Sequence, residues 1–383
     1  MSETETNVQL KATIFSPSEL ALIAPDLTLG KYLQAGYRPS MRKFDEFKPV
    51  IISKGGISRY DKDESVNNSI NWSTTALGSS SVKIGGTSTI CTISAGIVED
   101  DFEAINDYRM RLDADIIVAD EEEEKEILGG DLLATNGAVY PVVQIAKGST
   151  GPPNTEEIEL GEKLYEAILH SGLIDRNELK VDVGLQSVDE NGEQVILKGE
   201  DVGAISKKFS FVLNARIQVF GRTGPLFDQC YASLIKALKD TKLPDVYLNE
   251  RESSLRTRGG KKNANVNIQS FDLVCDPIKF RELKLRTDRI CWSSTFGIVD
   301  LETEHETDGD EKMEVTNESI LLADLEGDAE DSISKRISVL SNGDGHFTSI
   351  TIEKGNGERI TKRSIQEALR LAELRGNDMV KHL

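Results

Sequence analysis

A glycine turn lies where a strand pattern in the sequence changes to a helix pattern. Over Phe209–Phe220 apolar residues alternate with mostly polar ones, which is the period of a half-buried strand. From Leu226 to Leu238 apolar residues recur at helical spacing, with Pro225 in the first turn and Pro244 beyond the end. Backbone N–H groups and the helix dipole at such a helix start can bind an anion. The junction is therefore a candidate anion site, and the alternative is an ordinary strand-to-helix turn.

The residues that open this helix resemble one family. Gly224-Pro225-Leu226-Phe227-Asp228 is similar to the RNase PH-like family of exoribonucleases and RNA exosome ring subunits. In active members, the resemblance implies, a hydroxyl side chain and an arginine hold the attacking phosphate here. Leu226 and Phe227 occupy those positions without a charge or a donor, so they form a degenerate phosphate site. Non-catalytic ring subunits show a Gly-x-Leu-[Ile/Phe]-Asp pattern at this place, and this chain has it.

Two stretches nearer the N-terminus carry the same resemblance. Gly78–Ile97 is similar to the family's first-domain hairpin, with a Gly-x-Thr turn and an apolar strand. Gly36–Pro49 resembles the family's opening segment, whose usual form is Arg-x-Asp-Gly-Arg. Here Arg38 and Arg42 flank Pro39-Ser40-Met41, which predicts that the Asp-Gly turn is lost.

Two further stretches match the family pattern but lack its functional residues. Gly137–Ile174 resembles a strand, loop and helix whose loop carries RNA-gripping arginines in the nucleases, whereas here Lys147 is its only cation. In Leu321–Leu340 the position of the nucleases' acid/base aspartate is taken by Lys335 and Arg336, which cannot exchange a proton near neutral pH. We therefore predict no catalytic residue in this chain. An acidic run lies nearby: Asp324, Asp328, Glu330 and Asp331.

Composition agrees with this interpretation without requiring it. The 383 residues are 38% hydrophobic and 29% charged, which is typical of a soluble globular protein. No apolar run approaches a membrane span, and the acidic N-terminus does not resemble a signal peptide. The four cysteines (Cys91, Cys230, Cys275 and Cys291) are widely spaced in apolar stretches, and the four histidines show no ligand spacing. We expect buried reduced thiols, no metal site and no cofactor.

Charge is unevenly distributed along the chain. The 45 Lys+Arg against 65 Asp+Glu give a net charge of −20, which disfavours autonomous binding of nucleic acid. The acidic runs Asp120–Glu126 and Glu302–Glu314 are interpreted as solvated loops. The basic segment Arg251–Lys262 either contacts RNA or an acidic neighbour, or is a solvated hairpin loop. Its candidate RNA-binding residues are Arg256, Arg258, Lys261 and Lys262.

The expected fold class is α/β (α+β), the RNase PH-like fold implied by the resemblance, with two α/β sub-domains of mixed sheets packed against helices. Residues 1–15 are expected to be a flexible tail and 16–42 a helical segment, capped by Ser16 with Glu19 and broken at Pro25. The first domain is placed at 43–245 and the second at 246–383. Expected helices are Leu160–Ser171, Leu226–Lys239 and Lys362–Leu374, and expected later strands are Val266–Cys275, Arg289–Asp300, Ser319–Ala323, Ile333–Leu340 and His346–Glu353.

The resemblance implies a non-catalytic subunit of the six-membered RNase PH-like ring of the RNA exosome, serving 3′–5′ RNA processing and decay and ribosomal RNA maturation. Implied partners are other RNase PH-like ring subunits, a cap subunit with S1 and KH domains, an associated hydrolytic exoribonuclease, and RNA in the assembled pore. Implied locations are nucleus, nucleolus and cytoplasm, with no membrane partner. An active phosphorolytic 3′–5′ exoribonuclease is the alternative enzyme, and an acidic interaction module unrelated to RNA is a third hypothesis.

Overall fold

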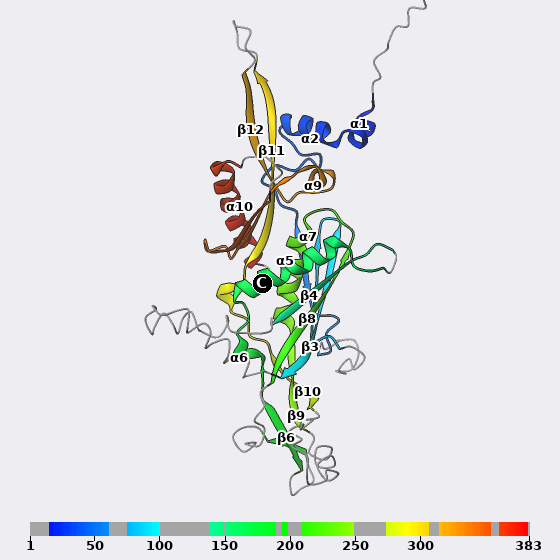
Figure 1. Ribbon diagram of the computed structural model, residues 1–383, viewed down its shortest axis with the longest axis vertical. Helices are drawn as coiled ribbons and strands as arrows, with labels where there is room; N and C mark the ends of the chain where they lie inside the picture. The colour runs from blue at the N-terminus through cyan, green and yellow to red at the C-terminus, as the bar shows by residue number, and fades with distance from the viewer. Residues whose placement is uncertain are drawn as a thin grey trace, which may run out of the picture. The chain divides into compact units, whose positions relative to one another are not determined.

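The computed structural model describes residues 15–60, 75–99, 138–148, 151–188, 194–197, 209–248, 273–305, 314–353 and 360–381 (Figure 1). Contacts divide the chain into two compact units, one of Met1–Lys48, Ser294–Ser338 and Ile350–Leu371 and the other of Pro49–Ser293, Val339–Ser349 and Ala372–Leu383. The units are defined by contacts between residues and do not test the boundaries of family domains. The predicted domains 43–245 and 246–383 therefore stay a prediction.

The second unit contains a six-stranded sheet in which β1, β2, β3, β8 and β4 lie side by side in that order. All its pairings are antiparallel except that of β4 with β8, and the short β5 also pairs with β8. The predicted strand Phe209–Phe220 is confirmed as β8, with the same bounds. The other strands are β1 (Val50–Lys54), β2 (Gly78–Ile84), β3 (Thr87–Glu99), β4 (Val139–Ile145) and β5 (Lys180–Val181).

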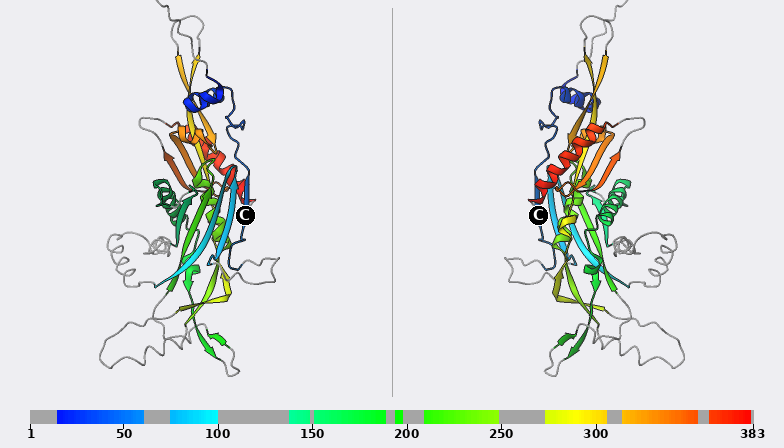
Figure 2. Two further views of the ribbon diagram at one scale, coloured as in Figure 1. Left: turned by 90° about the vertical axis from the view of Figure 1, so that its right-hand side faces the viewer. Right: turned by 90° about the vertical axis from the view of Figure 1, so that its left-hand side faces the viewer.

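Helices α5 (Thr155–Ser171) and α7 (Leu226–Asp240) pack against this sheet, and the short α6 (Arg176–Leu179) follows α5 (Figures 1 and 2). Both predicted longer helices are thus present, and α5 begins five residues earlier because Asn154 and Glu157 form a capping box. Most of α7 is buried. The core of the unit therefore lies between these helices and one face of the sheet.

A second sheet in this unit has the order β10-β9-β6-β7. The predicted strand Val266–Cys275 overlaps β10 from Leu273 onward, while 266–272 lie outside the described residues. A register shift lies between Cys275 and Phe280, and the strand continues to Glu282. The bounds of this sheet are β6 (Val183–Val188), β7 (Gln194–Leu197), β9 (Lys242–Leu248) and β10 (Leu273–Glu282), and a 3-10 turn (Thr287–Arg289) follows.

The third sheet has the order β12-β11-β13-β14. The interpretation of Glu302–Glu314 as a solvated loop is wrong at both ends, because 302–305 extend β11 and Glu314 begins β12, with His305 opposite Glu314. Backbone pairing satisfies N–H and C=O groups whatever the side chains are, so a hairpin can continue through an acidic run. Residues 306–313, and all of Asp120–Glu126, lie outside the described residues. The elements here are β11 (Trp292–His305), β12 (Glu314–Ala323), α9 (Asp328–Ser332), β13 (Lys335–Ser341), β14 (Phe347–Glu353) and α10 (Lys362–Val380).

The C-terminal helix α10 runs six residues beyond its predicted end at Leu374. A Gly-Asn pair at 376 and 377 is typical of a helix end. Here Gly376 instead lies so close to the backbone of Gly343 that a Cβ at 376 would meet the Gly343 nitrogen at 2.7 Å. The close approach of these backbones explains a glycine inside the helix. No helix within the described ranges is both long and apolar enough to cross a membrane.

The N-terminal helices are α1 (Pro17–Ile23) and α2 (Pro25–Gln34). The predicted capping box is confirmed, because Glu19 N donates to Ser16 Oγ at 3.4 Å and Ser16 N donates to the Glu19 carboxylate at 2.9 Å. The predicted break at Pro25 is also confirmed. The buried side of α2 joins a core of the first unit made by Leu29, Leu33, Leu301, Leu322, Leu325 and Ile333.

Candidate functional site

The start of α7 is covered by apolar side chains. Leu226 is only 4% exposed, and the Phe227 ring stacks on Tyr231 with 5.9 Å between ring centroids. Pro225, the N-cap residue, makes no side-chain cap. The carboxylate of Asp228 lies in the first turn and accepts a hydrogen bond from Ser293 Oγ, so the helix start already holds one negative charge. This arrangement disfavours a bound phosphate, and the match of Leu226 and Phe227 to the phosphate-holding positions stays a prediction.

The glycine turn before α7 has a structural role. Gly221 has φ +74°, and a Cβ there would meet the Gly86 carbonyl oxygen at 2.8 Å. Arg222 Nη1 lies 2.9 Å from the Glu156 carboxylate, and Thr223 N donates to Thr87 Oγ1 at 2.9 Å. These contacts join the turn to the β2–β3 hairpin and to α5.

Lys147 is ion-paired. Its Nζ lies 3.0 Å from Oε1 of Glu157, a largely buried carboxylate that also accepts from Ile145 N at 2.8 Å and Asn154 N at 2.6 Å. These backbone donors, with Lys147 beside them, lower the pKa of Glu157 against the opposing effect of burial. Part of the charge of Lys147 is thus balanced within the chain and is less available to an RNA phosphate.

Lys335 and Arg336 also make internal contacts. Lys335 is 6% exposed and its ammonium pairs with Asp300, while Arg336 donates to the carbonyl oxygens of Glu330 and, at 3.1 Å, Ile333. Burial opposes the charge of Asp300, but hydrogen bonds from Lys335 and Ser319 outweigh it and lower its pKa. Both cations hold the start of β13 in place. The side chains of Asp328 and Asp331 lie outside what the structure describes.

The largest polar cluster that we find in the first unit joins the opening segment to the turn after β12. Asp324 is its centre, with a buried carboxylate that contacts Arg42 Nη1 at 3.1 Å and Lys48 Nζ at 3.3 Å and accepts from Lys48 N at 2.8 Å. Glu326 pairs with Arg42 at 2.8 Å and with Lys48 at 3.4 Å. The guanidinium of Arg38 donates to backbone carbonyls of both segments, including Ala323 and Lys43. Arg38, Arg42, Lys48, Asp324 and Glu326 are called the Asp324 cluster below.

Sequence reasoning recognised Arg38 and Arg42 but missed this cluster. In the sequence Asp324 belongs to an acidic run, and nothing local links it to Arg42, 282 positions earlier. Two arginines and two lysines within eleven residues of a strongly acidic chain are the signal that could have suggested a buried carboxylate partner.

The prediction that the opening turn is lost is wrong. Met41 N donates to the Arg38 carbonyl at 2.8 Å, which closes a turn, and Met41 has φ +64° at the position where the family pattern has glycine. The Arg38, Arg42 and Asp324 contacts hold this backbone although methionine is disfavoured there. The turn is therefore kept while its usual residues are replaced.

We expect Met41→Gly to raise the free energy of unfolding by about 0.5 kcal/mol. A residue with a Cβ pays about 1–2 kcal/mol in the left-handed conformation, and glycine removes this cost. Glycine also has more conformational freedom in the unfolded chain, which cancels about 0.4–1 kcal/mol of that gain. Met41 is exposed, so little packing is lost. Met41→Ala is the control, because it shortens the side chain but keeps the disfavoured φ. Urea unfolding measures all three chains, and an equal gain in Met41→Ala would contradict the backbone explanation.

Stability should also fall in acid. The pKa of Glu326 is lowered, since hydrogen bonding to Ser40 and the charges of Arg42 and Lys48 outweigh burial. A carboxylate with a lowered folded pKa stabilises the fold above its unfolded value, near 4.5, and this contribution is lost as the pH falls through the folded pKa. We expect the urea concentration at the unfolding midpoint to decrease as the pH is lowered below about 4.5. Glu326→Gln should flatten this fall, and an unchanged acid profile in that variant would contradict the assignment.

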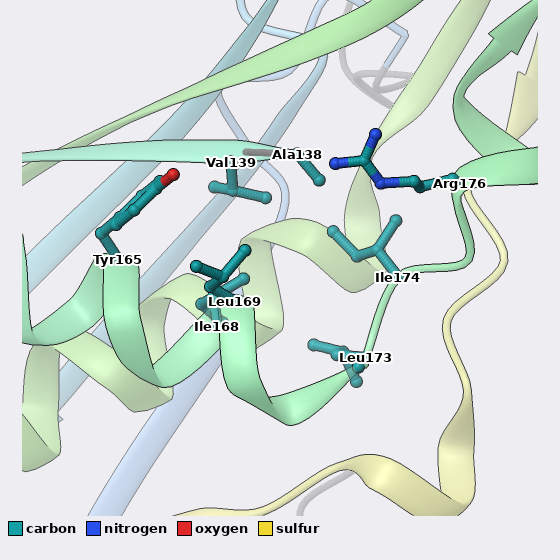
Figure 3. A pocket seen from close by; sticks show the side chains of 9 residues that line it. Ala138, Val139, Tyr165, Ile168, Leu169, Leu173, Ile174 and Arg176 are labelled. Atoms are coloured by element: carbon teal, nitrogen blue, oxygen red, sulfur yellow. The ribbon is translucent and has the colours of Figure 1, made fainter. Parts of the chain in front are cut away.

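Cavities in the described residues include one in the first unit and one beside α5. The first, of about 230 Å³, is lined mainly by apolar groups, including Leu29, Leu322 and Leu325, beside the saturated guanidinium of Arg38. The other, about 30 Å³, lies between α5 and β4, where Tyr165 and Leu169 face Val139 with Arg176 beside them (Figure 3). It has room for about one water molecule. Neither brings together groups that could catalyse a reaction.

Three cysteines are buried as predicted, and Cys275 on the edge strand β10 is exposed, which corrects the expectation for that residue. Burial raises the pKa of Cys230 to about 12, so this thiol is unreactive. Within the described ranges, no group of three or more His, Cys, Asp or Glu is placed to hold a metal ion. Arg256, Arg258, Lys261 and Lys262 lie outside these ranges.

The fold and the α7 junction define a protein of the RNase PH class. The RNase PH family model, described as 3′ exoribonuclease family, domain 1, matches residues 46–244. The chain belongs to this family, which confirms the predicted family and fold class.

One curated relative is the exosome complex component rrp43 of Schizosaccharomyces pombe, 23% identical over 241 residues, which is 63% of this chain and 66% of that protein. The family-like stretches taken as a set, over about residues 17 to 375, predict a resemblance to the ring subunit called ribosomal RNA-processing protein 43, and this match confirms it. Two solved structures show the same fold. The Archaeoglobus fulgidus exosome with RNA bound to the active site has a TM-score of 0.55 and 16% identity, covering 95% of this chain and 99% of that one. An archaeal exosome core has a TM-score of 0.51 and 14% identity, covering 95% and 98%.

Proposed function

We propose that this chain is a non-catalytic subunit of the RNase PH-like ring of an RNA exosome. The observation that carries the proposal is the start of α7, where buried Leu226 and stacked Phe227 stand at the positions expected to hold phosphate. Lys335 and Arg336, at the position of the acid/base residue, are held by Asp300, Glu330 and Ile333. The curated relative, named as an exosome complex component, and the exosome structures that share the fold support the choice of assembly.

The proposed partners are the other RNase PH-like ring subunits, a cap subunit with S1 and KH domains, and an associated hydrolytic exoribonuclease. The chain would support ribosomal RNA maturation and RNA decay in nucleus, nucleolus and cytoplasm. With a net charge of −20 and Lys147 paired to Glu157, it would depend on its neighbours for most of the positive field that attracts RNA. Changing Arg256, Arg258, Lys261 and Lys262 to Glu tests whether the basic segment contributes to RNA threading or to ring assembly.

The purified chain should not degrade RNA phosphorolytically. With a 3′-labelled RNA, inorganic phosphate and Mg²⁺ or Mn²⁺, we expect no release of nucleoside diphosphates, because neither Leu226 nor Phe227 can hold the attacking phosphate. An archaeal ring that is active under the same conditions serves as the positive control. Phosphate-dependent release of nucleoside diphosphates by the purified chain would establish the alternative, an active exoribonuclease.

Assembly is the positive test. Co-expressed with the RNase PH-like subunits of its source, the full chain should enter one complex with them at equal stoichiometry, measured by native mass spectrometry. Failure to join any of them would overturn the proposal and favour an interaction module unrelated to RNA.

A further inference from the structure

The six-stranded sheet has one face without a covering helix among the described elements. Residues alternate along β8: Leu213, Ala215 and Ile217 are buried against the helices, whereas Asn214 and Arg216 are exposed. The pairing registers carry this alternation to the neighbouring strands. The second face, called the open face, consists of every second residue within 51–53 of β1, 81–83 of β2, 88–98 of β3, 210–220 of β8 and 142–144 of β4. Tyr140 on the edge strand β4 is left out, because its ring stacks on Tyr165 of α5.

The open face is poor in charge for this chain. Lys83 and Arg216 are its only charged residues, and it has no aspartate or glutamate, although 29% of the chain is charged and carboxylates outnumber cations by 65 to 45. Exposed apolar side chains lie among its hydroxyl and amide groups: Ile51 is 63% exposed, Val142 54% and Phe220 43%.

The outer side of α5, on the opposite side of the same sheet, shows what a solvated surface of this unit is like. Glu159, Glu162 and Glu166 are exposed there, with Lys163 among them. Contact surfaces between proteins are depleted in acidic residues and lysine and enriched in aromatic residues and arginine. The open face fits this composition in two respects and departs from it in one. It lacks acidic residues and exposes Arg216 and Phe220, which lie four residues apart on β8, but it also holds several serines, which contact surfaces usually lack.

The dimensions of the open face also suit a protein partner. The ranges that make up the open face hold 31 residues, which at about 3.4 Å per residue and about 4.8 Å between strands cover roughly 500 Å². This is a little under two thirds of the roughly 800 Å² that one partner contributes to a standard interface.

We propose that the open face docks another protein chain, whose surface presents carboxylates to Lys83 and Arg216 and apolar side chains to Val142 and Phe220. RNA is a poorer occupant, since two cations over such an area neutralise few phosphates. The identity of the partner as a subunit of the same ring rests on the proposed function.

The test compares two full-length variants. Val142→Glu/Arg216→Glu places carboxylates on the open face, and Ile158→Glu is the matched control on the outer side of α5, where Ile158 is 49% exposed. Each is co-expressed with the RNase PH-like subunits and its share in the assembled complex is measured by native mass spectrometry. We expect the double variant to be reduced at least tenfold and the control to assemble as wild type does.

The outcomes separate this inference from the proposed function. Wild-type chain that joins no ring subunit overturns both. If the wild type and the double variant assemble equally, the docking face alone is overturned. The same holds if the control variant loses as much of its share in the complex as the double variant does. If the double variant has a lowered thermal midpoint by itself, Arg216→Glu replaces it.

A second measurement uses the unaltered chain. Acetylation of Lys83 should slow several-fold on assembly, while Lys163 on α5 stays reactive. Equal reactivity of Lys83 in the free and assembled chain, or RNA crosslinks at Val142 and Phe220 in place of protection by protein, would overturn the proposal.

Discussion

Replacing Asp324 with alanine is expected to lower the free energy of unfolding by about 3–5 kcal/mol, because the two largely buried cations Arg42 and Lys48 would then share the single carboxylate of Glu326. The side chain of Lys48, the partner left behind, is only 6% exposed. Asp324 also has φ +50°, a conformation that disfavours alanine. Urea unfolding followed by circular dichroism gives the change.

Two further variants separate the causes. Asparagine tolerates the left-handed conformation and keeps an acceptor for Lys48 N, so Asp324→Asn should lose less than Asp324→Ala, and its remaining loss reports the charge. Asp344→Ala, at an exposed aspartate, should stay within about 0.5 kcal/mol of wild type. A loss below about 1 kcal/mol in Asp324→Ala would show that the Asp324 cluster does not stabilise the fold.

Gly78→Ala should be the most damaging glycine substitution in the large sheet. A Cβ at Gly78 would lie 2.4 Å from Thr241 Oγ1 and 2.7 Å from the Ala237 carbonyl oxygen, at the end of α7. Thr241 Oγ1 already donates to Ala237 O, and Lys242 N donates to Leu77 O, so this backbone has little freedom to retreat. We expect a loss of about 3 kcal/mol, the upper part of the range for overpacking.

Gly96→Ala is the matched control for this substitution. It also lies within a strand of the same sheet, and an added Cβ there meets nothing within 4 Å. We expect a change within about 0.5 kcal/mol, measured by the same urea unfolding. Equal losses at the two positions would mean that strand glycines matter here for a reason other than the approach of α7.

Elements whose signal is local could be predicted from the sequence. The alternation over Phe209–Phe220 defines β8 because one face of that strand is buried and the other is not. The helical spacing from Leu226 and the capping box at Ser16 act within one or two turns, so no tertiary contact was needed to recognise them. The family resemblance rests on the same local motifs.

The features that escaped prediction depend on distant parts of the chain. The position of Gly376 inside α10 is explained by Gly343, and the turn at Met41 is retained beside contacts of Arg38 and Arg42 with Asp324. The acidic hairpin end at His305 and Glu314 exists through pairing, which composition does not reveal. For the same reason, Asp324 could be noticed as an acid but not as the centre of a cluster.

The discontinuous make-up of the first unit has a consequence for synthesis on the ribosome. Its opening part ends at Lys48, and its next part begins at Ser294. At about 5–20 residues per second, roughly 10–50 s pass before β11 and β12 emerge to cover Leu29 and Leu33 of α2. Pro49–Ser293, which is nearly all of the other unit, emerges in that interval. The nascent chain thus exposes an apolar helix while its larger unit is being made, and this helix is a natural target for chaperones that act during translation.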